Sequence, residues 1–328
     1  MLNRLAIIGL GSIGRRHLRL ISEIRPDIKI IAVRSGHGER CDEEKMAAKT
    51  VYSIGEAVDE GVQAAIISSP ATLHLKQSLE LAKNGIHLLI EKPISHTSDM
   101  TGELLKIVNN NNITVMVGYV LRYEPGAIKF KNWLSSKMTG KILHVRIECG
   151  SYLPDWRPEQ NYKETVSALS ELGGGVLLEL SHEIDYLHWF FGKPIDVQAQ
   201  VRNSETLDIS VEDQVDLLIT NEEGFLISVQ LDFNRRYTKR SCSVITTEGE
   251  LIWDAVKKNV VWKCVGEEQS KYTYNNERDS IYRKQLKIFF DCIENNNDPI
   301  VTIEDGINVI NLIDAVRKAS EKGVKVLL

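Results

Sequence analysis

Three glycines near the start of the chain constrain its fold more than any other feature of the sequence. Gly9, Gly11 and Gly14 form the pattern G-x-G-x-x-G, which directly follows the apolar run 4–9 and opens the helical pattern 12–23. In this context the first glycine permits a tight turn and the second lets a pyrophosphate approach the backbone. The third lets the helix pack closely on the strand. The pattern therefore predicts a dinucleotide-binding domain of the Rossmann type.

The residues that follow these glycines bear on which dinucleotide binds. We expect the amides around Ser12 and Ile13 to face the phosphates from the N-terminus of the helix. About 20 residues further on, an acid normally binds the ribose of NAD. The sequence has Arg34 and Ser35 there, with no carboxylate until Glu39. Because a guanidinium and a hydroxyl can hold the 2′-phosphate that a carboxylate would repel, we predict that NADP(H) is favoured, with NAD(H) as the alternative.

Apolar runs alternate with helical patterns through the N-terminal part of the chain, which is typical of a parallel α/β sheet. The runs are apolar on both faces, so helices are expected to cover both sides of the sheet. We predict strands at 4–9, 29–33, 50–52, 64–68, 87–90 and 114–118, and helices at 12–23, 55–60, 72–84 and 99–108.

The pattern changes after Gly118. Expected elements are a helix at 126–135, a strand at 142–148, a helix from the glycines at 173–175 through Phe190, antiparallel strands between Asp196 and Trp262, and helices at 281–295 and 304–322. The sequence thus predicts two domains. Residues 1–121 are expected to form a doubly wound parallel sheet, and residues 122–328 an α+β domain with a mostly antiparallel, open sheet. A cleft between two such domains is the usual place for a ligand.

Composition and charge exclude several classes of protein. The 40 Lys and Arg residues against 45 Asp and Glu residues give a formal net charge of −5, which argues against a nucleic-acid partner. No apolar run approaches the roughly 20 residues of a membrane helix, and the N-terminus lacks the pattern of a signal peptide. We therefore expect a cytoplasmic protein with no membrane partner. The five cysteines are scattered and form no C-x-x-C pair, so neither a disulfide framework nor a metal site is expected.

Four further segments carry a more specific signal. They are Ser-Pro-x-x-x-His at 69–74, Glu-Lys-Pro at 91–93, the run 118–125 that begins Gly-Tyr-Val-Leu-Arg, and the glycine-led segment 173–192. Together they resemble the glucose–fructose oxidoreductase/inositol dehydrogenase/MocA family over nearly the whole chain, and Glu-Lys-Pro is the most specific of the four. The resemblance adds further cofactor contacts to those of the glycine loop: Ser69, Pro70, His74, Glu91, Lys92 and Pro93.

The resemblance also implies a catalytic set. In this family the lysine of Glu-Lys-Pro touches the nicotinamide cofactor and the substrate hydroxyl, which implies Lys92 here, and the catalytic histidine corresponds to His182. The family places an Asp four residues before that histidine, whereas this sequence has Glu179, three before. Asp185 fits the common H-x-x-D pattern, so either acid is a candidate partner of the histidine. Such a histidine suits proton transfer because its ordinary pKa lies near neutrality, and an ammonium can stabilise a developing alkoxide.

Substrate contacts are expected in two regions. The segment 151–165 offers aromatic faces for sugar rings and cationic groups for a carboxylate or phosphate, although it also suits a surface loop or a subunit contact. Residues 119–122 lie nearer the expected cleft, and Asp185 follows the histidine. The candidate substrate residues are Tyr119, Arg122, Trp156, Arg157, Tyr162 and Asp185.

The resemblance implies an NAD(P)-dependent oxidoreductase that acts on a hydroxyl-bearing carbon of a sugar, sugar derivative or nucleotide sugar. An inositol or polyol dehydrogenase and a non-catalytic, cofactor-binding sensor of the same fold are the alternatives. A phosphate-binding α/β protein of another kind would leave Glu-Lys-Pro unexplained. Relatives commonly associate through the sheet of the second domain, so we also expect a homo-oligomer, either a dimer or a tetramer.

Overall fold

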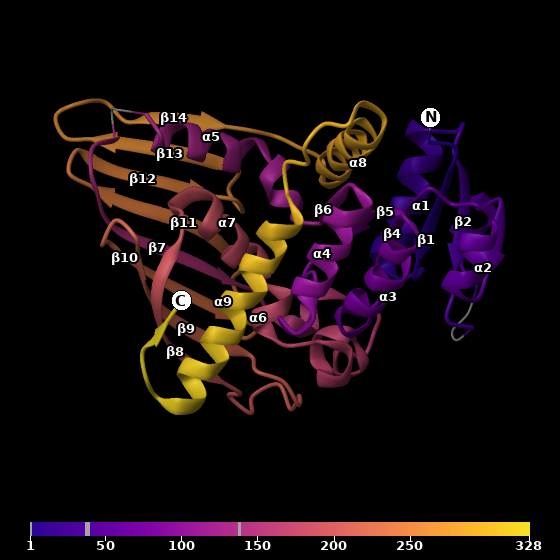
Figure 1. Cartoon of the computed structure of the whole chain (residues 1–328). Helices are drawn as coiled ribbons and strands as arrows, with labels where there is room; N and C mark the ends of the chain where they lie inside the picture. Colours follow the sequence, from indigo (N-terminus) through magenta and orange to yellow (C-terminus); the bar gives the residue numbers. More distant parts are fainter. Residues whose placement is uncertain (1, 37–39, 137–138) are drawn as a thin grey trace. The chain divides into compact units, whose positions relative to one another are not determined.

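The computed structural model describes residues 2–36, 40–136 and 139–328. Glu39, the first acid after the second strand, lies outside them. The chain forms two compact units (Figure 1): Met1–Val120 with Glu277–Ile310, and Leu121–Asn276 with Asn311–Leu328. The first unit thus includes Glu277–Ile310 from the tail, whereas the sequence prediction assigns the whole tail to the second domain, 122–328. The division into a cofactor domain at 1–121 and a substrate domain at 122–328 stays a prediction.

The first unit is built on a parallel sheet whose described strands follow the order β3-β2-β1-β4-β5-β6. The strand bounds agree with the predicted ones to within one residue: β1 (Arg4–Ile8), β2 (Lys29–Val33), β3 (Lys49–Val51), β4 (Ala64–Ile67), β5 (His87–Ile90) and β6 (Val115–Val117). Strand order reverses between β1 and β4, which is where doubly wound sheets bind dinucleotides. The predicted N-terminal fold is confirmed.

Helices of this unit follow the strands in the alternating order that the sequence predicts. They are α1 (Ser12–Ile24), α2 (Ile54–Asp59), α3 (Ala71–Lys83), α4 (Thr101–Asn111), the short 3-10 helix η1 (Asp42–Met46) and, from the tail, α8 (Arg278–Asn295). Arg16 and Arg19 of α1 both bond to Asp279 of α8. These ion pairs help to join the tail helix to the first unit. The apolar periodicity of the two helices does not predict them.

The second unit contains a nine-stranded sheet within the described residues, in the order β14-β13-β12-β11-β7-β10-β9-β8-β15 (Figure 1). All of its pairs are antiparallel except β7 with β10, so the predicted mostly antiparallel sheet is confirmed. The strands are β7 (Ile142–Gly150), β8 (Pro194–Arg202), β9 (Gln214–Asn221), β10 (Leu226–Asp232), β11 (Lys239–Thr246), β12 (Gly249–Asp254), β13 (Asn259–Cys264), β14 (Ser270–Thr273) and β15 (Val326–Leu327).

Alternation along these strands buries one face of the sheet. In β9, Val215 and Ile219 are fully buried, whereas the intervening Leu218 is 38% exposed. Exposed Leu226 and Ile245 lie in one cross-strand row of the same outer face, on either side of His144. The helices of this unit are α5 (Pro125–Leu134), α6 (Val176–Glu179), α7 (Ser181–Phe191) and the C-terminal part of α9 (Ile303–Lys322).

One predicted helix is wrong. The sequence predicts a continuous helix from the glycine triplet through Phe190, but the chain turns at the buried Leu180, with φ −98° and ψ 27°, and this turn separates α6 from α7. Tertiary contacts decide this, because Glu183 of α7 is fully buried and bonds to Arg240 of β11. Glu179 and His182 therefore do not share a continuous helix face.

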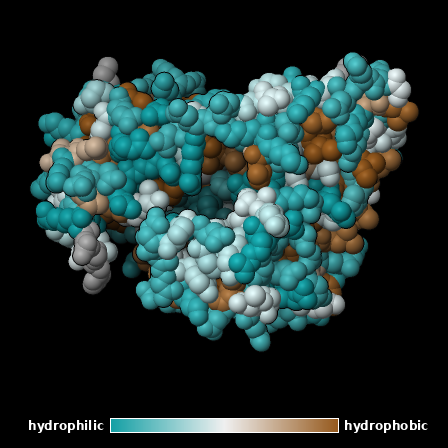
Figure 2. All heavy atoms as spheres, turned by 180° about the vertical axis from the view of Figure 1, so that it is seen from behind, coloured by the Kyte–Doolittle hydropathy of each residue, from teal (hydrophilic) through white to brown (hydrophobic). Residues whose placement is uncertain are grey.

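Figure 2 shows the hydropathy of the residues on one face of the molecule. Hydrophilic residues cover most of the face seen in Figure 2, and the hydrophobic ones form small patches. No helix in the described part of the chain is long and apolar enough to cross a bilayer.

Candidate functional site

The glycine loop has the geometry that a bound pyrophosphate needs. Gly9 has φ +86°, and a Cβ on it would lie 2.9 Å from the backbone nitrogen of Ser69, so only glycine fits where β1 and β4 end side by side. A Cβ on Gly14 would lie 1.9 Å from the carbonyl oxygen of Gly9, so the helix packs directly on the turn. Around Gly11, by contrast, no described atom lies within 4 Å of that position. This open space at the N-terminus of α1, which begins at Ser12, fits a dinucleotide phosphate.

The end of β2 carries a buried ion pair that the sequence does not predict. Arg34 Nη1 donates to Glu44 Oε2 over 2.9 Å, and Glu44 Oε1 accepts a hydrogen bond from Thr50. Both charged side chains are nearly covered, with 10% and 6% exposed. Ser35 is exposed beside them. The guanidinium proposed for the 2′-phosphate thus shares its charge with a carboxylate ten residues on.

The Glu-Lys-Pro turn follows β5, which β4 separates from β1 and its glycine loop in the order of the sheet. Glu91 is 7% exposed, and its Oε1 lies 2.7 Å from Nε2 of the fully buried His17 in α1. Its other oxygen would be 2.7 Å from a Cβ on Gly118, so that position admits no side chain. Lys92, which precedes Pro93 through a cis peptide bond, is half-buried.

His74 lies beneath this turn rather than open to a ligand. The ring is 2% exposed, with Nδ1 2.8 Å from the carbonyl oxygen of Pro93 and Nε2 2.7 Å from that of Ser69. Burial lowers its pKa, and this outweighs the two carbonyls and the charge of Glu91, which act in the opposite direction. Pro70 is the N-cap residue of α3, in the same turn as Ser69.

In the second unit, two candidate substrate residues contact each other. Arg122 Nε lies 3.1 Å from each carboxylate oxygen of Asp185, and Nη2 lies 2.7 Å from Oδ1. Both side chains are almost completely buried, and the guanidinium also lies over the ring of Trp189, 5.7 Å from its centroid. Such a forked, buried pair fixes α7 where His182 lies, one helical turn before Asp185.

His182 and Glu179 are both half-buried, His182 in the first turn of α7 and Glu179 at the end of α6. Glu183, the residue after His182, joins α7 to the sheet, because Arg240 Nε of β11 donates to Glu183 Oε1 over 2.9 Å. Burial raises the pKa of the neighbouring Cys149 thiol to about 12, so this cysteine stays protonated. Tyr119 is fully buried.

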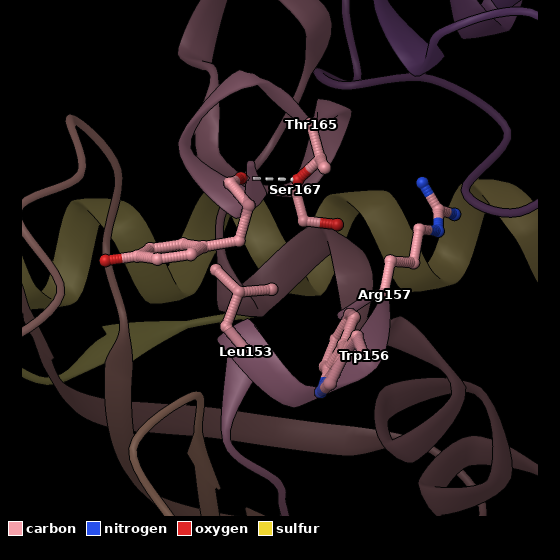
Figure 3. A pocket seen from close by; sticks show the side chains of 6 residues that line it. Leu153, Trp156, Arg157, Thr165 and Ser167 are labelled. Carbon is pink, nitrogen blue, oxygen red and sulfur yellow. Dashed lines mark hydrogen bonds between the residues drawn. The ribbon is translucent and has the colours of Figure 1, made fainter. Parts of the chain in front are cut away.

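Three candidate substrate residues do come together. Trp156, Arg157 and Tyr162 line one small, open pocket with Leu153, Thr165 and Ser167 (Figure 3). The indole of Trp156 donates a 2.7 Å hydrogen bond to Ser151 Oγ and its ring meets Phe233 edge-on, so its orientation is fixed. Arg157 is exposed and makes no ion pair with a described residue. The loop therefore presents an aromatic face and a cation to the same space.

Sequence reasoning missed one further buried group. Glu124, directly before α5, is 7% exposed; its Oε1 accepts a 3.0 Å hydrogen bond from Tyr274, whose hydroxyl in turn accepts one from Trp253. Burial raises the pKa of Glu124 to about 7. The signal in the sequence is weak, because a glutamate before the proline of a helix start is ordinarily exposed. No group of three or more His, Cys, Asp or Glu side chains in the described ranges is placed to hold a metal ion.

The fold and these contacts define a class: a two-unit protein with a doubly wound dinucleotide-binding sheet and a separate α+β unit that carries acid, base and aromatic groups. The family model described as "Oxidoreductase family, NAD-binding Rossmann fold" matches residues 3–119, and "Oxidoreductase family, C-terminal alpha/beta domain" matches residues 134–328. The chain therefore belongs to the glucose–fructose oxidoreductase/inositol dehydrogenase/MocA family. The predicted family, fold and oxidoreductase class are confirmed.

Known relatives are similar over almost the whole chain. It is 25% identical to 1,5-anhydro-D-fructose reductase of Ensifer adhaerens, over 98% of this chain and 97% of the relative. It is also 25% identical to inositol 2-dehydrogenase/D-chiro-inositol 3-dehydrogenase of Halalkalibacterium halodurans, over 98% and 92%. Among solved structures, levoglucosan dehydrogenase in complex with NADH and levoglucosan superposes with a TM-score of 0.88 at 17% identity, covering 99% of both chains. That last similarity concerns the fold alone.

Proposed function

We propose that this oxidoreductase transfers a hydride between a nicotinamide cofactor and a hydroxyl-bearing carbon of a sugar, a sugar derivative or a nucleotide sugar. The observation that carries the proposal is the Glu91-Lys92-Pro93 turn, which is anchored on both sides of its lysine and follows β5 in a dinucleotide-binding sheet. The names of the relatives support the substrate class, since they refer to an anhydrosugar, to inositol and to levoglucosan.

The residues would divide the chemistry as follows. When bound, the nicotinamide supplies or accepts the hydride. Lys92 donates a hydrogen bond to the reacting oxygen and stabilises its developing negative charge. His182 takes the hydroxyl proton during oxidation and returns it during reduction. Because Asp185 is held by Arg122, we assign the orientation of the imidazole to Glu179 and the placement of α7 to the Arg122–Asp185 pair.

We propose that the cofactor is NADP(H) rather than NAD(H), with Arg34 and Ser35 contacting the 2′-phosphate. The Arg34–Glu44 ion pair makes this preference modest, because the guanidinium is already partly neutralised. The glycine loop and its neighbours supply the remaining cofactor contacts, from Gly9, Gly11, Ser12, Ile13, Gly14, Ser69, Pro70, Glu91, Lys92 and Pro93.

The pocket in the loop after β7 suits part of such a substrate. The face of Trp156 can stack on a sugar ring, and Arg157 can hold a carboxylate or phosphate attached to it. We therefore propose that this loop selects among substrates, and that anionic sugars bind better than neutral ones. Tyr119 lies inside the protein, so we propose that it shapes the site rather than faces the ligand.

We further propose a cytoplasmic homo-oligomer that associates through the outer face of the second sheet. The exposed apolar side chains of Leu218, Leu226 and Ile245 on that face support this. Light scattering at micromolar concentration measures the oligomeric state, and a monomer would contradict the association.

Nicotinamide absorbance with purified protein tests the function. Oxidised and reduced cofactors are screened against neutral sugars, sugar acids, nucleotide sugars and inositols, with Lys92→Ala as the inactive variant and Lys106→Ala, exposed on α4, as the matched control. We expect turnover with at least one sugar class in wild type and control, and its loss in Lys92→Ala. Cofactor binding without turnover on any substrate would indicate a sensor instead.

A further inference from the structure

We infer that His74 is a positioning residue that holds the Lys92 turn in place through the backbone, rather than a residue that contacts the cofactor. Its imidazole connects two turns that follow neighbouring strands, the one after β4 at Ser69 and the one after β5 at Pro93. The inference deepens the proposed function, because it concerns how the chain places the lysine assigned to the reacting hydroxyl.

The contacts of the ring favour this role over ligand binding. Both ring nitrogens lie within 2.8 Å of backbone carbonyl oxygens, and the side chain is 2% exposed. Both partners are acceptors, so the neutral ring donates to one carbonyl at a time and only the protonated ring donates to both. In either state each nitrogen faces a backbone carbonyl, and the ring has no nitrogen left for a cofactor. The backbone carbonyl of His74 accepts a 2.7 Å hydrogen bond from Ser78 Oγ one turn on in α3. The ring is therefore carried by an ordered helix.

The other side of the turn is held independently. Glu91, the residue before the lysine, bonds to His17 through its side chain and to Ile67 through its amide, which donates to the carbonyl oxygen over 2.9 Å. Lys92 is thus flanked by a residue held from α1 and a residue held from α3. Loss of the His74 contacts would release one flank while the other stays fixed.

The consequence for catalysis follows from geometry. A donor that stabilises a developing alkoxide acts over hydrogen-bond distance, and a misplacement of about 1 Å can cost up to about a hundredfold in rate. Because the cofactor phosphates are held at the glycine loop, we expect release of the turn to lower kcat far more than it weakens cofactor binding.

Two variants test the inference. His74→Phe keeps the volume and removes the ring's contacts with both carbonyls, whereas His74→Gln keeps an amide donor that can reach one carbonyl. In hydrogen–deuterium exchange, we expect the amides of residues 92 and 94–96 to exchange at least tenfold faster in His74→Phe, with intermediate rates in His74→Gln. With the substrate found in the screen, we expect kcat per bound cofactor to fall at least tenfold in His74→Phe, with KM within threefold of wild type and partial recovery in His74→Gln.

His87→Phe is the matched control. His87 begins β5 at the opposite end from the turn, and its Nδ1 accepts a 2.9 Å bond from the Thr114 amide, so this variant also loses a histidine–backbone bond in the same sheet. We expect it to leave kcat and the exchange of residues 92 and 94–96 unchanged. Unchanged exchange in folded His74→Phe overturns the inference, as does faster exchange with wild-type kcat per bound cofactor. A wild type that turns over no substrate refutes the proposed function instead, and the exchange rates alone then decide whether His74 holds the turn.

Discussion

Replacing Glu124 by Gln should make the second unit more stable at alkaline pH and leave it nearly unchanged at pH 5. The carboxyl is 7% exposed, one oxygen accepts from Tyr274, and the other is buried with no hydrogen-bond partner among the described residues. Burial therefore penalises the charged form and raises the pKa from 4.5 to about 7. The positive charges of Arg240 and Lys258 only partly offset this.

The sign and the size follow from linkage. Below pH 4.5 the carboxyl is protonated in both folded and unfolded chains, so the site costs nothing. As pH rises from 4.5 to about 7, the unfolded chain loses its proton while the folded chain retains it, and stability falls until both are ionised. At about 1.4 kcal/mol per pKa unit, wild type loses about 3 kcal/mol between pH 4 and pH 8 at this site. The glutamine variant avoids that loss, but it buries an amide without an acceptor at a cost of about 1 kcal/mol.

We therefore expect Glu124→Gln to be about 2 kcal/mol more stable than wild type at pH 8 and within about 1 kcal/mol of it at pH 5. Urea unfolding followed by tryptophan fluorescence is the assay. It reports on the second unit, because all five tryptophans, at 133, 156, 189, 253 and 262, lie in it. The exposed Glu268→Gln serves as the control. A stability difference that is the same at both pH values would refute the account of a buried, destabilised carboxylate.

The remaining predictions concern the proposed chemistry. Lys92→Ala and His182→Ala should each lower kcat by about a hundredfold or more. In steady-state assays the double variant should lose less than the product of the two, because both groups act on one hydroxyl. Calorimetry should show tighter binding of NADP(H) than of NAD(H). This preference should rise several-fold in Glu44→Gln, because the carboxylate that neutralises Arg34 is then absent. Tighter binding of NAD(H) in both proteins would contradict a contact between Arg34 and the 2′-phosphate. Asp185→Ala should destabilise the second unit by about 3–5 kcal/mol in urea, because it removes the carboxylate that pairs with a buried guanidinium; a loss under 1 kcal/mol would contradict that.

The fold could be predicted from the sequence wherever local pattern and tertiary structure agree. The buried strands of the first unit read as short apolar runs, and their bounds were predicted to within one residue. The break between α6 and α7 could not be predicted, because apolar periodicity continues through Leu180 and only contacts with a distant strand, such as Glu183 with Arg240, fix the second helix. The grouping of α8 with the first unit likewise could not be predicted, because it depends on ion pairs between residues far apart in the sequence. Arg19 and Asp279, for example, are 260 residues apart.

Motifs in the sequence predict which residues belong to the candidate site, but not how those residues are arranged. Motifs identify residue types at fixed offsets, so they located the turn at Lys92 and the helix at His182. They carry no information on partners. Glu44 lies ten residues from Arg34, and a motif cannot show that a carboxylate at that distance turns back to neutralise a guanidinium.

There is a physical reason why motifs do not reveal the partners of their residues, and the same reason explains why the motifs contain both reactive and buried polar residues. A catalytic ammonium or imidazole must be held to a fraction of an ångström while its tip stays accessible, so the holding contacts have to come from buried neighbours. Next to the proposed catalytic residues Lys92 and His182, the contacts are polar: Glu91 bonds to His17, the carbonyl of Pro93 to His74, and Asp185 to Arg122. A buried polar group that loses its partner costs more than an apolar one, which makes each such position sensitive to substitution without any contact to substrate. The motif is therefore a mixture of groups that act and groups that hold them, and only the second kind should show kinetic defects that a conservative donor can partly repair.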